Sequence, residues 1–243
     1  MYARTLVSIA LIAATSTLAA CSSDNVLGLG VAGSGSADTN TVNTARVRFV
    51  NATATSLDIA TGGVVAAGNG AIEYGASSSC ISTNALTPNL AVRIAGTTSV
   101  VPGFSSTFQS GVSYTVIAYP GANGATQFAT LTDTYTPAAG QSGVRAFNAS
   151  SPNSSYDVYV TEPAAPLATT PPSFATVTAG TASNFFGYSA GTSQQVRITT
   201  AGSKAVLLDV GNLALIVGQN ITLVIAPPLV GSTVPRTFLV ASC

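Results

Sequence analysis

The feature that most constrains this chain is an internal repeat, because the same pattern occurs twice in the same order. The paired segments are 47–52 (VRFVNA) with 144–149 (VRAFNA), 92–94 (VRI) with 196–198 (VRI), and 111–116 (GVSYTV) with 218–223 (GQNITL). The number of residues that separates the two copies of a segment increases along the chain, as expected when the second copy has longer loops between the same strands. The repeat therefore predicts two domains of roughly 100 residues, which is a usual size for a folded domain.

The sequence of each repeat is typical of an all-β protein. Short runs of alternating Val, Ile, Thr, Tyr and Phe are separated by Gly, Asn, Ser and Pro, which is typical of strands and turns. The expected strands are Arg46–Asn51, Leu90–Ala95, Ser113–Tyr119, Gln127–Thr132, Val144–Asn148, Tyr156–Thr161, Gln195–Thr200, Ile221–Ala226 and Thr237–Ala241. The stretch Ala205–Val217 fits helix or strand by periodicity, but its glycines favour strand and turn. We place the domains at 45–136 and 142–243, because Pro and Gly in Thr136–Gln141 interrupt any continuous strand.

The N-terminal residues have the pattern of a targeting segment. Arg4 precedes the apolar run Leu6–Ala14, which is too short to span a bilayer comfortably. The following Leu18-Ala19-Ala20-Cys21 resembles the bacterial lipobox, in which the Cys is lipidated and becomes the mature N-terminus. We expect residues 1–20 to be a signal peptide and Cys21 to be the lipid anchor. The alternative is an ordinary secretory peptide with an incidental Cys.

The segment after Cys21 is predicted to be a tether. Residues 22–44 are rich in Gly, Ser, Asn and Thr and have no sustained apolar period. As a flexible coil, such a segment would span on the order of 25 Å. An edge strand formed by part of it is the alternative. In the lipoprotein pathway that this segment resembles, Ser22 permits transfer to the outer membrane, so we expect an envelope protein anchored there, on its periplasmic or surface face.

The composition argues against several classes of function. The chain has no His and no Trp, and 8 Lys and Arg balance 8 Asp and Glu. Without His, this chain alone supplies no imidazole for acid-base catalysis, zinc sites or Ser-His-Asp triads. Because the charges balance, the chain also lacks the excess of basic residues with which proteins bind the phosphates of nucleic acids. We expect no cofactor and no nucleic-acid partner.

The second repeat resembles a bacterial family catalogued as domain of unknown function 4397. Its typical opening, Val-Arg-x-x-Asn/His-Ala-Ser-Pro followed by Asp-Val-Tyr-Val, is close to Val144–Pro152 and Asp157–Val160. The first repeat departs from it, because Asn51-Ala52-Thr53 lacks the Pro and Leu57–Ala60 is a weaker form of the second motif. The resemblance implies an all-β fold of two tandem antiparallel β-sandwich domains, immunoglobulin-like, on a secreted or surface protein. It brings no catalytic residues.

Two cysteines remain besides Cys21. An oxidising envelope permits a disulfide between Cys80 and Cys243, which would link the two repeats. The alternative is that both thiols are unpaired or form bridges between molecules.

Two sets of charged residues recur in the repeats. Asp58 and Asp157 occupy the same place beside the Asn51 and Asn148 turns, where a Ca²⁺ site is one interpretation. We favour bonding to nearby backbone or to the Arg of the repeat, and predict no metal site. The recurring arginines could form an anion site, but we expect their stems to cover apolar surface and their heads to meet acids or solvent. They are Arg48, Arg93, Arg145 and Arg197.

Three further features have a chemical and a structural interpretation. The tyrosines could stack on sugars, but core and strand packing explains most of them. They are Tyr74, Tyr114, Tyr119, Tyr135, Tyr156, Tyr159 and Tyr188. The run Ser77–Ser79 has only Lys204 as a potential Ser-Lys partner, so a Ser-Lys hydrolase is disfavoured. The Pro-rich segment 162–172 is expected to be an exposed spacer loop, with partner binding as the alternative.

These observations together predict a monomeric, lipid-anchored envelope protein. It would act as a non-catalytic binding, adhesion or structural module for an unknown envelope or extracellular ligand. A Ser- or carboxylate-dependent hydrolase and a scaffold of a surface layer are the alternatives.

Overall fold

The computed structural model describes residues 43–243 except residues 106 and 151. The predicted signal peptide, the lipid site Cys21 and nearly all of the tether lie outside the described residues. The described part contains fifteen strands and no helix, so it also contains no helix able to cross a membrane. The strands are β1 Thr44–Asn51, β2 Leu57–Thr61, β3 Val64–Val65, β4 Ile81–Asn84, β5 Leu90–Ile94, β6 Ser113–Pro120, β7 Thr126–Thr132, β8 Gln141–Asn148, β9 Ser155–Thr161, β10 Phe174–Thr178, β11 Phe186–Ser189, β12 Gln194–Thr200, β13 Val206–Leu213, β14 Asn220–Ala226 and β15 Arg236–Ala241.

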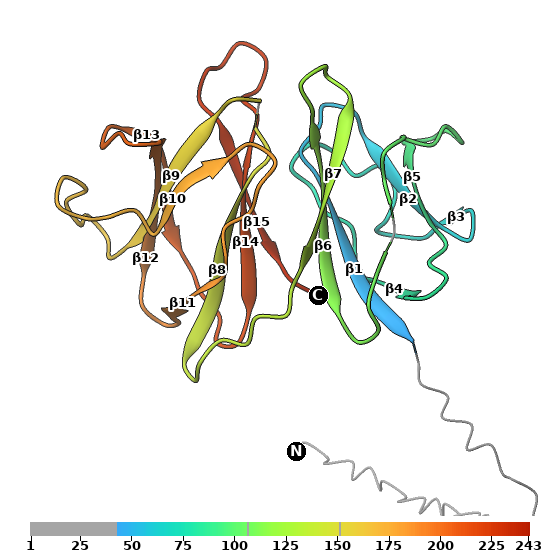
Figure 1. Ribbon diagram of the computed structural model, residues 1–243, viewed down its shortest axis with the longest axis horizontal. Helices are drawn as coiled ribbons and strands as arrows, with labels where there is room; N and C mark the ends of the chain where they lie inside the picture. The colour runs from blue at the N-terminus through green and yellow to red at the C-terminus, as the bar shows by residue number, and fades with distance from the viewer. Residues whose placement is uncertain (1–42, 106, 151) are drawn as a thin grey trace, which may run out of the picture. The chain divides into compact units, whose positions relative to one another are not determined.

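The strands form four sheets, two in each half (Figure 1). The first half contains the sheets β4-β1-β6-β7 and β3-β2-β5, and the second contains β11-β8-β14-β15 and β10-β9-β12-β13. The predicted fold class, an all-β protein of tandem β-sandwiches, is confirmed. The strand β13 agrees with the glycine breaks that favoured strand over helix there.

One pair of strands in each half is parallel, although the expected sandwiches were antiparallel. β1 pairs in parallel with β6, and β8 pairs in parallel with β14. Parallel neighbours need a long connection. Here the chain between them forms the facing sheet and one edge strand of the same sheet, β4 or β11. The remaining strand pairs are antiparallel.

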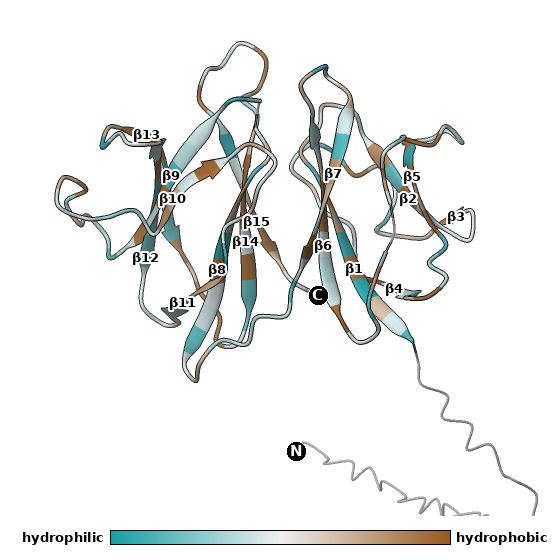
Figure 2. Ribbon diagram, viewed as in Figure 1, coloured by the Kyte–Doolittle hydropathy of each residue, from teal (hydrophilic) through white to brown (hydrophobic). Residues whose placement is uncertain are grey.

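Each sandwich has its own hydrophobic core, and a third core joins the two. Successive side chains of a strand point to opposite faces, so Val47 and Phe49 of β1 enter the first core while Val50 points the other way. Figure 2 shows hydrophobic and hydrophilic residues interspersed along the strands. In β8, Val144 and Ala146 enter the second core while Phe147 points away from it. We call this third cluster the seam. Its buried members are Val50, Ala52, Ile117, Phe147, Ala149, Val224, Ala226 and Val240.

Five strands are missing from the expected set, and all but β2 lie at sheet edges. The four edge strands, of two to five residues each, are β3, β4, β10 and β11. The central strand β2 contains Leu57–Ala60, the weaker form of the family's second motif. An edge strand pairs on one side only. Its alternation is therefore brief, and it is hard to distinguish from a loop in the sequence.

Candidate functional site

The repeated aspartates are structural ligands for backbone amides. The two carboxylate oxygens of Asp58 accept hydrogen bonds from the amides of Ala71 and Gly96, at 2.7 and 2.8 Å. Asp157 accepts in the same way from Thr176 and Gly202, at 2.7 and 2.8 Å. All four donors have positive φ, and Thr176 lies at the register shift of β10. Each aspartate thus fixes two irregular backbone positions of its sandwich, which agrees with the structural interpretation of this residue pair.

The repeated asparagines organise the turn after the first strand of each sandwich. In both, the side-chain amide donates to two backbone carbonyls, and its oxygen accepts from the N–H and hydroxyl of the residue two positions later, forming an Asx-type turn. The partners are Thr55, Ile72 and Thr53 for Asn51, and Ser154, Val177 and Ser150 for Asn148. The recurring Asn-Ala-Ser/Thr pattern is explained by this turn.

Glycines allow aromatic rings to cross the seam. Gly75 and Gly180 have φ of 84° and 76°, and each N–H bonds to the carbonyl of the repeated asparagine, Asn51 or Asn148. A Cβ on Gly75 would lie 2.7 Å from the Phe238 ring, and one on Gly180 would lie 2.9 Å from the Tyr119 hydroxyl. The aromatic ring comes from the other sandwich in both cases. The two halves therefore make corresponding contacts with each other.

A buried ion pair lies on one side of the seam. Nη2 of Arg145 is 2.5 Å from Oδ1 of Asp133, and the Asp133 side chain is fully buried. Nη1 of Arg145 donates to the Thr132 carbonyl, and Nε donates to Thr222. Burial raises the pKa of Asp133, although Arg145 and the Thr115 hydroxyl act in the opposite direction. Burial lowers the pKa of Arg145, and Asp133 opposes this change. The pair ties the end of β7 to β8.

Arg48 makes the corresponding contact on the other side of the seam. Its Nη1 donates to the Ala241 carbonyl at the end of β15, at 2.7 Å, and its Nη2 donates to Sγ of Cys80, at 3.1 Å. Arg48 and Arg145 thus each bond to the last strand of the opposite sandwich.

Of the four recurring arginines, Arg145 pairs with an acid, and the Arg93 head bonds to the Gly63 carbonyl at the exposed surface, as expected. Arg48 bonds to a carbonyl and a sulfur, and Arg197 to the Thr161 hydroxyl, so neutral groups replace an acid there. The Nε atoms of Arg48, Arg93 and Arg197 are buried without a hydrogen-bond partner among the described residues.

The disulfide between Cys80 and Cys243 is present and connects the two sandwiches, with a Cα–Cα distance of 5.8 Å. In the second sandwich, Phe185 occupies the position that corresponds to Cys80. The correspondence follows from two equivalent serines, Ser78 and Ser183, whose hydroxyls accept hydrogen bonds from backbone amides of β1 and β8. Cys80 lies two residues after Ser78, and Phe185 lies two residues after Ser183. Phe185 packs under Arg145, whose guanidinium carbon lies 4.4 Å from the ring centroid.

The linker between the sandwiches is held in place by Tyr135. Its ring stacks on Phe185 with centroids 5.4 Å apart, and its carbonyl accepts a bond from Asn220. Gly143 and Gly187 are paired between β8 and β11, and a Cβ on either would lie within 3 Å of Tyr135. From the sequence we predicted only a break between two strands in this linker. The absence of side chains at Gly143 and Gly187 leaves room for the Tyr135 ring on the sheet, and this signal was not recognised.

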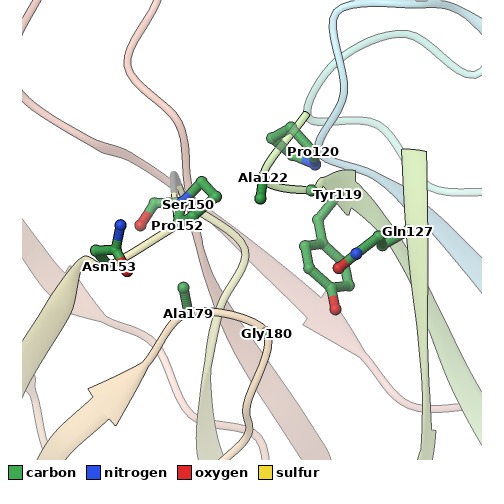
Figure 3. A pocket seen from close by; sticks show the side chains of 10 residues that line it. Tyr119, Pro120, Ala122, Gln127, Ser150, Pro152, Asn153, Ala179 and Gly180 are labelled. Carbon is green, nitrogen blue, oxygen red and sulfur yellow. The ribbon is translucent and has the colours of Figure 1, made fainter. Parts of the chain in front are cut away.

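A cavity opens at the loop end of the seam (Figure 3). It measures about 210 Å³ and takes its lining from both sandwiches. Figure 3 shows Tyr119 and Gln127 on one side and Asn153 and Ala179 on the other. A second cavity of about 480 Å³ is lined by equivalent loops with the roles of the sandwiches exchanged. Its lining residues are Ala52, Ala54, Tyr74, Pro120, Pro227, Pro228, Leu229 and Val230. Neither lining contains a charged side chain, so both suit uncharged ligands.

The serine and lysine side chains considered for a hydrolase make structural contacts. The Ser78 hydroxyl bonds to the Phe49 amide and the Ser79 carbonyl, whereas the Lys204 ammonium bonds to the Thr170 carbonyl and lies over the Tyr159 ring. These contacts do not form a Ser-Lys pair.

The Pro-rich segment packs back onto its own sandwich. Leu167 is buried, and the amide of Ala164 donates to the side chain of Gln195. Lys204 bonds to the same loop. This segment is therefore a fixed connection between β9 and β10.

The fold and the seam define a protein of two tandem β-sandwiches. Residues 45–159 match the model of the family described as domain of unknown function (DUF4397). The match supports this domain family for a stretch that covers the first sandwich and continues into β9 of the second. A search of curated proteins found no match.

Proposed function

We propose that this protein is a bacterial envelope lipoprotein whose two sandwiches are tandem copies of the DUF4397 domain. We further propose that it acts as a non-catalytic binding or structural module.

Support for two copies comes from contacts that recur residue by residue. The aspartate that binds two backbone amides, the asparagine turn and the arginine that bonds to the opposite last strand are all present twice. The second set of contacts lies partly beyond the residues matched to the family. Such detailed correspondence is expected when one domain has been duplicated.

The observation that carries the binding proposal is the loop end of the seam. The linker, the disulfide and the buried ion pair fix the two sandwiches together, so loops from both enclose the same uncharged cavities. A rigid scaffold that presents loops is a common design for binding proteins. The cavities offer hydroxyl, amide and apolar groups for recognition.

The non-catalytic proposal rests on how the carboxylates are used. Five of the described acidic side chains make structural hydrogen bonds with the chain itself. They are Asp58, Glu73, Asp133, Asp157 and Asp209. A general acid or base needs access to substrate, and these groups already serve turns, hydroxyls and an arginine.

The anchor is tested by mass spectrometry of the protein purified from its native host. We expect an acylated Cys21 as the first residue. An unmodified form that begins elsewhere and is released into the medium would remove the lipoprotein assignment.

The binding role is tested by photo-cross-linking the full-length protein in its native envelope. A photoreactive residue at Gln127 or Asn153 is expected to give a discrete adduct. The matched control is the same residue at Leu86, which is 73% exposed and does not line either cavity. Equal labelling at all three positions would refute a binding role for the loop end. Turnover in a hydrolase screen, lost on changing one serine or carboxylate, would favour an enzyme.

A further inference from the structure

A second candidate surface lies between two edge strands of the second sandwich. β13 and β15 are edge strands of their respective sheets. A cleft of about 480 Å³ lies between them. Its lining residues are Leu208, Asp209, Val210, Ser232, Val234, Pro235, Arg236 and Thr237. Because β15 is an edge strand, one row of its backbone N–H and C=O groups faces away from the sheet and is free of strand pairing.

The first sandwich fills the corresponding side with an aromatic plug. Phe104 packs edge-on against Phe49 of β1 and Phe128 of β7, with ring centroids 5.3 and 5.6 Å away. The preceding residue, Gly103, lies against the Thr126 carbonyl at the start of β7. The segment carrying Phe104 therefore covers the edge of the first sandwich from within the chain.

The second sandwich has smaller residues at the positions of this plug. Phe128 pairs with Ala118, and its equivalent Thr237 pairs with Ile225 in the same register. Phe49 is replaced by Ala146. Leu239 lies directly opposite the core residue Leu223 and is 48% exposed. An apolar side chain at this edge is therefore accessible to a partner.

We propose that this cleft binds an extended segment of a partner protein that pairs with the free edge of β15 and inserts an aromatic side chain beside Thr237. The first sandwich supplies the template for the occupant, since a phenylalanine ring fills the equivalent place there. Strand addition provides main-chain hydrogen bonds, and the cleft selects the side chain. The cleft shares no lining residue with the two loop-end cavities, so this inference is independent of the function proposed above.

The test uses the disulfide-bonded protein and a fluorescent peptide that copies residues 99–108, which include Phe104. Fluorescence anisotropy is expected to show saturable binding. Changing Phe104→Ala in the peptide should weaken binding about tenfold or more, because an aromatic anchor dominates such contacts. This comparison requires no change in the protein.

On the protein, Thr237→Phe supplies the ring from within and should lower peptide affinity about tenfold or more. Its matched control, Thr237→Val, keeps the β-branched shape and should bind as the wild type does. Absence of saturable binding, equal binding to the Thr237→Phe variant, or binding insensitive to Phe104 overturns the proposal. Concentration-dependent dimerisation that competes with the peptide in sedimentation would instead assign the cleft to a second copy and also overturns it.

Discussion

Replacing Gly75 by Ala tests whether the seam is as tightly packed as described. Two costs arise from this change. A left-handed backbone conformation costs an L-residue about 1–2 kcal/mol, and Gly75 has φ of 84°. The added methyl would also lie 2.7 Å from the Phe238 ring, and overpacking of this kind costs about 1–3 kcal/mol. We therefore expect Gly75→Ala to lower the free energy of unfolding by about 2–5 kcal/mol.

The matched control is Gly191→Ala. Gly191 has a similar φ of 87°, but an added Cβ there would meet nothing within 4 Å. The control isolates the backbone cost, so it should lose only about 1–2 kcal/mol. Urea unfolding of the disulfide-bonded protein measures both variants. In thermal unfolding, each kcal/mol should lower Tm by about 2–4 °C for a protein of this size. Equal losses in the two variants would show that Phe238 does not pack on Gly75, and the account of the seam would be wrong.

Three further changes have defined outcomes. Asp133→Ala leaves Arg145 buried without its partner and should destabilise the fold by about 3–5 kcal/mol in urea unfolding; a loss below about 1 kcal/mol would contradict a buried pair. Because the pKa of Asp133 is raised, the folded state holds its proton more tightly than the unfolded state, so this group's contribution to stability should fall as pH rises from the ordinary carboxyl pKa through the folded one. Unfolding titrations of the wild type and Asp133→Asn should differ in this pH slope. Asp157→Ala leaves the backbone amides of Thr176 and Gly202 without an acceptor and should cost about 2–4 kcal/mol, with faster hydrogen exchange at both amides as the check. Replacing Cys80 and Cys243 by Ser should lower stability by up to about 5 kcal/mol, and an unchanged unfolding midpoint would show that the bridge contributes nothing.

The repeat and the alternation in the sequence were sufficient to predict two β-strand domains, because alternation and turn residues are local signals, whereas the sandwich architecture was implied by the family resemblance. The structural role of Asp58 and Asp157 could also be inferred, since a short carboxylate beside a turn commonly binds backbone. The parallel pairing of β1 with β6 could not be read from alternation, because the period of a strand is the same whichever way its neighbour runs.

The seam and the loop-end cavities could not be predicted from the sequence, for a different reason. Val50 and Phe147 alternate with core residues, so the sequence shows that they face outward from their own sheet. It does not show what covers them. The cavities are built from loops that are distant in the chain, and their lining has no charged residue to attract notice. Gly75 and Gly180 were the available signal, because a glycine at the same place in both repeats suggests close approach by another group.

The Cys80–Cys243 bridge also determines how the protein would respond to force. The two cysteines are 163 residues apart, so a pull applied between the start of β1 and the end of β15 reaches Cys243 directly from Cys80. Only residues 44–80 could then lengthen, by on the order of 130 Å at full extension, compared with on the order of 700 Å when the bridge is open. With the bridge closed, the second sandwich is outside the path of the load. The second sandwich would stay folded while the first strands of the first sandwich unfolded under the applied force.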